Sequence, residues 1–141
     1  MDEERFIKWE PVEGINFPCA DISFKSRNRD GLIVVLHFSY FKGNPAKDLK
    51  LTFKNAISLR WEEELGVWLI PLPESLPKIS KEPWSTWRFP LLKVVNSKLL
   101  SQVSEIGSMA DGCGHFILTS LNDTLEVLAN ENVTIEWIDP A

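Results

Sequence analysis

The hydrophobic positions of this chain repeat mostly with a period of two, which is the spacing of a β-strand with one buried face. Ile22 and Phe24 alternate with polar residues, and the segment 26–31 that follows has the composition of a hairpin loop. Residues 32–41 are apolar at most positions, which is typical of a central strand covered on both faces. Further alternating segments predict strands at 48–54, 57–62 and, beyond a turn at 65–66, at 67–70. We therefore expect a meander of four or five antiparallel strands in this half of the chain.

Residues 71–90 interrupt the alternation with five of the nine prolines in the chain. Proline cannot donate a hydrogen bond to a sheet, so this stretch predicts a long extended loop. Loops of this length in a compact domain often serve a function. Two of the six tryptophans, Trp84 and Trp87, lie on it.

One segment after the proline-rich loop has the spacing of a helix. Asn96 or Ser97 can cap its start, and Gly107 lies where a helix commonly ends. Its apolar residues recur at i, i+1, i+4 and i+7, namely Leu99, Leu100, Val103 and Ile106. Residues 108–114 predict a loop, and 116–121 and 133–137 predict strands.

Residues 124–129 fit two structures. Leu125 and Val127 alternate with polar neighbours, as in a strand, whereas Asp123 followed by Glu126 resembles the capping box of a helix. We predict a short helix here. The fold class is then α+β: a β-rich single domain over residues 1–141, with one antiparallel twisted sheet of six to eight strands and one or two short helices on a face.

The composition limits the classes of function. Fifteen Lys and Arg against twenty Asp and Glu give a net charge of −5, which argues against binding to nucleic acid or to a membrane surface. The acidic first residues lack an apolar stretch, so we expect no secretory signal and a cytoplasmic location. An acidic chain of this kind suits a basic protein partner.

Residues with catalytic or metal-binding chemistry are few. Cys19, Cys113, His37 and His115 offer the ligand atoms that zinc prefers, but only Cys113 and His115 are close in sequence. His37 lies in a predicted central strand, where we expect it to be hydrogen-bonded. Cys113 and His115 are also the one nucleophile–base pair, on a loop rich in glycine that fixes geometry poorly. We therefore predict no metal, no cofactor and no catalytic site, and an enzyme using this pair ranks third among the hypotheses.

Two groups of residues are candidates for a binding surface. Glu62 and Glu64, with Arg60, lie on the outward face of a predicted strand end, where they could attract a basic partner. Trp84 and Trp87 are large, rigid side chains suited to anchoring an interface. The remaining strand tryptophans are expected in the core or, in the alternative hypothesis of a small-molecule-binding domain, around an apolar cavity; they are Trp61, Trp68 and Trp137.

Several strings resemble those of small bacterial immunity proteins, which accompany polymorphic, contact-dependent or type VI toxins. They are Leu59-Arg-Trp-Glu-Glu-Glu64, Ile70-Pro-Leu-Pro73, Phe89-Pro-Leu-Leu-Lys-Val-Val-Asn-Ser97 and Ser120-Leu-Asn-Asp-Thr-Leu-Glu-Val-Leu-Ala129. The resemblance lies in size and style across most of the chain and carries no residue-level motif. It implies a single-domain, non-catalytic protein that binds one cognate toxin and occludes its active site.

Overall fold

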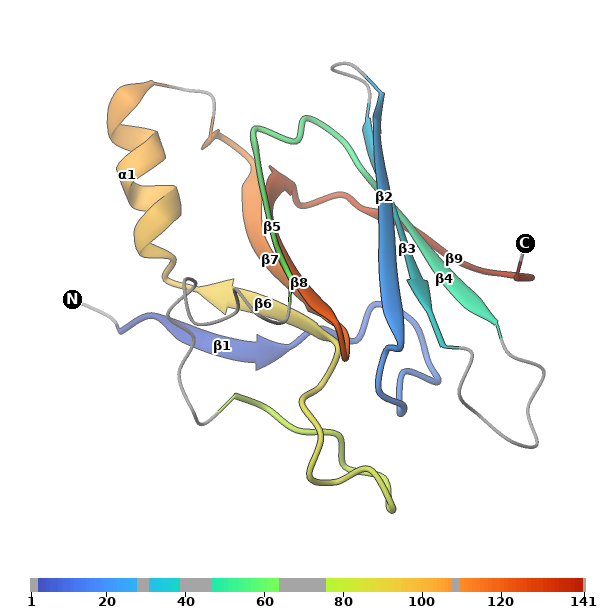
Figure 1. The fold of residues 1–141 in the computed structure, drawn as a ribbon. Helices are drawn as coiled ribbons and strands as arrows, with labels where there is room; N and C mark the ends of the chain where they lie inside the picture. Colours follow the sequence, from blue (N-terminus) through green and yellow to red (C-terminus); the bar gives the residue numbers. More distant parts are fainter. Residues whose placement is uncertain (1–2, 28–30, 39–46, 64–75, 108–109, 141) are drawn as a thin grey trace.

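The computed structural model describes residues 3–27, 31–38, 47–63, 76–107 and 110–140. These residues form two antiparallel sheets and one helix, as Figure 1 shows, so the predicted α+β, β-rich fold class is confirmed. None of the described helices is both long and apolar enough to span a membrane.

The four-stranded sheet begins with the predicted meander. Its order is β2-β3-β4-β9, with bounds β2 (Asp21–Arg27), β3 (Gly31–His37), β4 (Asp48–Phe53) and β9 (Thr134–Ile138). The even positions of β3 face inward and are buried, as are Ile22 of β2 and the odd positions of β4. The polar alternating positions face solvent, which is the pattern that the sequence predicts for a half-buried sheet.

The five-stranded sheet combines strands from both halves of the chain. Its order is β1-β6-β7-β8-β5, with bounds β1 (Arg5–Lys8), β6 (Leu91–Val95), β7 (Cys113–Thr119), β8 (Asp123–Asn130) and β5 (Ser58–Glu63). The expectation of one sheet is therefore wrong, because β5 leaves the meander and pairs with β8 instead of β4. Strand β9 takes the place beside β4.

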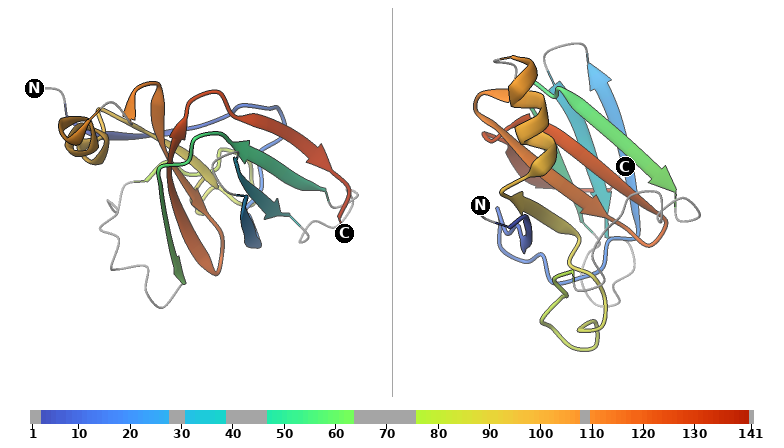
Figure 2. Two further views of the ribbon diagram at one scale, coloured as in Figure 1. Left: turned by 90° about the horizontal axis from the view of Figure 1, so that it is seen from above. Right: turned by 90° about the vertical axis from the view of Figure 1, so that its left-hand side faces the viewer.

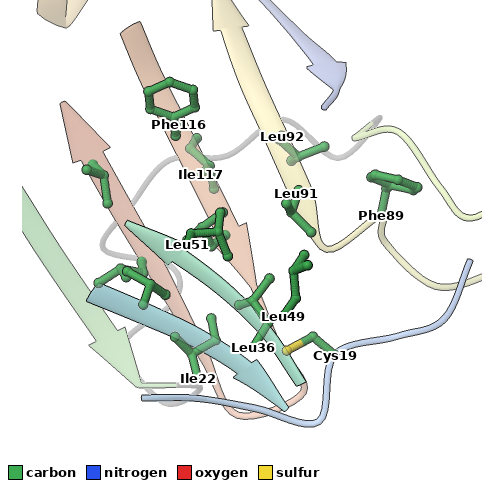
Figure 3. Close-up of a cluster of buried hydrophobic side chains, with 14 of the residues drawn as sticks. Cys19, Ile22, Leu36, Leu49, Leu51, Phe89, Leu91, Leu92, Phe116 and Ile117 are labelled. Carbon is green, nitrogen blue, oxygen red and sulfur yellow. The ribbon is translucent and has the colours of Figure 1, made fainter. Parts of the chain in front are cut away.

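The core lies between the two sheets. Phe53 of β4 and Phe116 of β7 meet there, with ring centroids 5.3 Å apart, and both side chains are fully buried. Figure 3 shows the shared cluster, in which Ile22, Leu36, Leu49 and Leu51 of one sheet lie among Leu91, Phe116 and Ile117 of the other. Cys19 and Phe89 extend the cluster at its rim.

Helix α1 (Lys98–Ile106) lies against the five-stranded sheet, as the views in Figure 2 show. Its predicted bounds are confirmed, because Ser97 is the N-cap and Gly107 follows the last turn. The Ser97 hydroxyl accepts a hydrogen bond from the backbone N–H of Leu100 at 3.1 Å. This bond satisfies one of the donors that a helix start leaves without a partner.

Two further sequence predictions fail in this sheet. Residues 124–129 belong to strand β8 and not to a helix, and Cys113 and Gly114 belong to β7 and not to the predicted loop. Strands β1 and β6 were not predicted. The predicted strand at 67–70 lies outside the described residues, and the described part of the proline-rich loop, 76–90, contains one isolated bridge between Lys78 and Arg88.

Candidate functional site

Strand β5 forms one edge of the five-stranded sheet. Among the described residues it pairs with β8 alone, and every side chain along it is exposed or half-buried. Leu59 and Trp61 lie opposite Val127 and Leu125, which are fully buried on the inner face. Leu59 and Trp61 nevertheless remain 39% and 44% exposed, because they sit at the rim of that face. The inner face of the sheet therefore reaches the protein surface along β5.

A third apolar side chain continues this rim on the other sheet. Phe24 of β2, also an edge strand, is 39% exposed, and its ring centroid lies 6.3 Å from that of Trp61. The two edges thus present an aromatic pair that spans the gap between the sheets. We call the set Phe24, Leu59, Arg60, Trp61, Glu62 and Glu63 the β5 surface.

The indole of Trp61 is held in place before any partner binds. Its Nε1–H donates to Oδ2 of Asp123 at 2.7 Å, and Asp123 is 7% exposed. The hydroxyl of Ser120 donates to the other oxygen of the same carboxylate, and the backbone N–H of Ser120 donates to the Asp123 carbonyl at 2.9 Å. Because the side chain is already oriented, binding through Trp61 costs less conformational entropy than binding through a free side chain.

Charged side chains accompany the apolar ones on β5. Arg60 and Glu62 lie opposite Glu126 and Thr124 on the outer face, as predicted from the alternation, and Glu63 lies opposite Asp123. Glu64 lies outside the described residues. Charges on an edge strand discourage uncontrolled pairing with other sheets, so they also limit which partner can approach.

The two loop tryptophans differ in their surroundings. Trp84 is half-buried and packs against the core, and its ring lies edge-on to Phe17 at a centroid distance of 5.0 Å. Trp87 is 43% exposed, while its backbone N–H donates to the carbonyl of Trp84 and its carbonyl accepts from Ile79. Trp84 therefore anchors the loop, and Trp87 is the member that faces solvent.

The structure does not bring the two predicted groups into one site. The proline-rich loop leads into β6, and β6 is separated from β5 by β7 and β8. Three strand spacings amount to about 14 Å. The β5 surface and Trp87 are therefore two patches at different parts of the molecule.

The predicted trio of core tryptophans is wrong for Trp61, which lies on the surface. Trp137 of β9 is half-buried, 5.7 Å from Phe38 between ring centroids, and its Nε1–H donates to the Glu13 carbonyl at 3.3 Å. Trp68 lies outside the described residues.

Trp9, which the sequence left unplaced, packs on Phe116, with ring centroids 4.6 Å apart. An open hollow of about 420 Å³ is lined by residues 10–16 and not by Trp61. Because Trp68 lies outside the described residues, the alternative of a tryptophan-lined cavity stays a prediction.

His115 is engaged in a buried network beneath α1. Its Nε2 lies 2.9 Å from Oε2 of Glu126, and its Nδ1 lies 2.6 Å from the hydroxyl of Ser97. The hydrogen bond from His115 lowers the pKa of Glu126, although partial burial of the carboxyl opposes this effect. The carboxylate therefore accepts Nε2–H, and Nδ1 accepts the Ser97 hydroxyl proton.

This network affects the hypothesis of a Cys113–His115 pair. Both ring nitrogens of His115 already have partners, so His115 is not directed at the Cys113 thiol. The pKa of the Cys113 thiol is raised, mainly by burial and to a smaller extent by the negative charges of Asp111 and Glu131. A raised pKa disfavours the reactive thiolate. Cys19 is buried and its thiol donates to the backbone carbonyl of Asp21 at 3.2 Å. The described residues contain no cluster of three potential metal ligands.

Sequence reasoning missed Phe24 and Leu59 as surface residues. Both alternate correctly with polar neighbours, so they were expected to be buried. The available signal was the acidic run directly after the strand, which is typical of an edge strand.

Comparison with known proteins finds no relative: no family model, no curated protein and no solved structure matches this chain.

Proposed function

We propose that this chain is a stoichiometric, non-catalytic inhibitor that binds a protein partner through the β5 surface and occludes it. The observation that carries the proposal is an exposed apolar trio, Phe24, Leu59 and Trp61, on two neighbouring edge strands. Aromatic side chains with a fixed orientation are the residues that most often dominate binding energy at protein interfaces. The edge of β5, which pairs with β8 alone among the described residues, can also accept a strand from the partner.

The chemistry of the surface specifies the partner further. Glu62 and Glu63 stand at one end of β5, and the chain carries a net charge of −5. A partner that presents an apolar or aromatic strand beside Lys or Arg residues would complement both features. The resemblance to immunity proteins implies a secreted bacterial toxin as this partner, and the acidic end of β5 would suit a toxin whose active site or substrate groove is basic.

The first experiment tests the function itself. The chain is co-expressed with the product of the adjacent open reading frame, and both co-purification and relief of toxicity are measured. We expect a one-to-one complex and restored growth. If the two proteins neither co-purify nor restore growth, the proposal of an inhibitor of that product is wrong.

The second experiment locates the surface. Trp61→Ala should weaken binding of the partner by about 30-fold, which corresponds to ~2 kcal/mol for an interface hot spot. Trp87→Ala is the matched comparison, because the two tryptophans are 44% and 43% exposed. Leu59→Ser should weaken binding as well, while Ile106→Ser, at a 79% exposed position on α1, should not. A loss that follows Trp87 and spares Trp61 and Leu59 would assign binding to the proline-rich loop.

A further inference from the structure

Ser23, His37 and Asp48 form a hydrogen-bonded chain on the outer face of the four-stranded sheet. Nδ1 of His37 lies 2.9 Å from Oδ2 of Asp48, and Nε2 of His37 lies 3.0 Å from the hydroxyl oxygen of Ser23. The three residues come from the adjacent strands β2, β3 and β4, where His37 is opposite Asp48 in register and Ser23 is opposite Val35. These three hydrogen-bonded residues lie on the face of β2 opposite to that of Phe24, so they are separate from the β5 surface.

The connectivity fixes the direction of the hydrogen bonds. An ionised Asp48 carboxylate can only accept, so Nδ1 of a neutral His37 carries the proton and Nε2 accepts the Ser23 hydroxyl proton. Exposure increases from Asp48 through His37 to Ser23. The side chain of Asp48 is 6% exposed, that of His37 is 32% exposed, and Ser23 is open to solvent. A buried orienting carboxylate, a histidine base and an accessible hydroxyl are the parts of an activated nucleophile.

A second serine, histidine and carboxylate chain in the same molecule provides a comparison. In Ser97, His115 and Glu126 the serine binds Nδ1 and the carboxylate binds Nε2, which reverses the arrangement at His37. Ser97 is only 5% exposed, and its oxygen also accepts the Leu100 N–H as a helix cap. The hydrogen bonds of Ser97, His115 and Glu126 are therefore structural. Beside His37, by contrast, the serine is exposed.

We propose that Ser23 is an activated nucleophile that takes an acyl group from small, activated carboxylic esters. The Ser23 oxygen forms a bond to the ester carbonyl carbon, and its proton passes to Nε2 of His37. The bond from that carbon to the leaving oxygen then breaks, and the leaving alkoxide takes the proton from His37. The products are an acyl ester on Ser23 and a free alcohol. Asp48 orients the ring and stabilises its transient positive charge.

The sheet register gives the charged groups that surround Ser23, His37 and Asp48. Asp21 lies directly opposite His37, Lys25 is two residues beyond Ser23 on the same face of β2, and Lys50 lies opposite Val35. Lys50 is 3.9 Å from Glu136. Lys25 and Lys50 are therefore cations on the same sheet face as Ser23, and an ammonium on this face can offset negative charge on the carbonyl oxygen.

The test uses the whole chain and p-nitrophenyl acetate as the probe. After a short incubation, peptide mapping by mass spectrometry measures acetylation at each serine. Ser58 and Ser101 are internal controls, because both are exposed and neither has a histidine partner among its described hydrogen bonds. We expect acetyl ester on Ser23 to form at least about 10²-fold faster than on these controls, since a general base contributes about that much or more.

Two variants separate activation from mere exposure. His37→Gln keeps a hydrogen-bonding side chain but removes the base, and it should reduce acetylation of Ser23 by about 10²–10⁴-fold. Asp48→Asn should reduce it as well, by leaving the histidine without its orienting charge. Acetylation of Ser23 at the rate of Ser58 and Ser101 in the unmodified protein, or an unchanged rate in His37→Gln, would overturn the proposal. The comparison between serines requires no variant to fold.

Discussion

One hydroxyl oxygen links the helix to the sheet in this protein. Ser97 caps α1 through the Leu100 N–H and donates to Nδ1 of His115 on β7, so the same atom orients the helix and satisfies a buried imidazole. Glu126 completes the network from β8. Buried polar groups are costly when they lose a partner, because neither water nor another group replaces it. The network therefore stabilises one arrangement of α1 on the sheet.

Replacing Ser97 tests this link. Ser97→Ala should lower the free energy of unfolding by about 1–3 kcal/mol, since it removes a helix cap and leaves Nδ1 of His115 without its donor. Urea denaturation followed by fluorescence measures the change. Ser104→Ala is the matched control: its hydroxyl donates to the Leu100 carbonyl at 2.9 Å on the exposed face of the helix, and its loss should change stability by less than about 0.5 kcal/mol. Equal effects from the two variants would contradict the role of Ser97.

At the scale of elements, the sequence predicted strands best where only one face is covered. Strand β4 alternates strictly and was predicted, and β2 alternates over residues 21–25, which is the part of it that was predicted. Strand β8 lies between β7 and β5, and both of its faces are largely buried, so Leu128 on the outer face joins Leu125 and Val127 on the inner face. This combination imitates the spacing of a helix. The apparent capping box is also used otherwise, because Asp123 binds Trp61 and Glu126 binds His115.

The pairing of strands could not be predicted from local pattern. A strand with one apolar face fits beside many partners, and β5 pairs with β8, which lies more than sixty residues further along the chain. Strand β6 was missed because four of its five residues are apolar, on both faces, and the strand stands between Pro90 and a helix cap. The candidate site follows the same rule: its charged residues were found from the sequence, whereas the exposure of Leu59 and Trp61 depends on which strand forms the edge.

Helix α1 is expected to be the least stable regular element. It contains no buried residue, and its apolar side chains Leu99, Leu100 and Val103 are only half-buried. Elements with little buried apolar surface open locally at a lower free energy than the core. Hydrogen–deuterium exchange should therefore show α1 amides at least about tenfold less protected than those of β7 and β8, a difference of ~1.4 kcal/mol. Protection of α1 equal to that of β8 would show that the helix opens only with the whole molecule.

At the scale of the whole molecule, two sheets share one core, and in the described part of the chain each sheet ends in edge strands. The described edge strands are β1 and β5 in one sheet and β2 and β9 in the other. An exposed edge with apolar side chains pairs readily with other chains unless charge opposes it. The net charge of −5 provides that repulsion at neutral pH, and it vanishes near the isoelectric point of about 5.1. Solubility at neutral pH and an available β5 surface are therefore compatible.

This balance leads to a prediction about self-association. Light scattering of the purified chain should rise as the pH falls from 7 to its isoelectric point, because the loss of net charge lets β5 edges approach each other. Leu59→Lys places a charge on that edge and should suppress the rise. Ile106→Lys is the matched control, since it adds the same charge at an exposed apolar residue of α1, and the isoelectric point shifts equally in both variants. If Ile106→Lys suppresses scattering as strongly as Leu59→Lys, net charge alone controls association. If only Leu59→Lys does so, β5 is the edge through which this protein meets other chains.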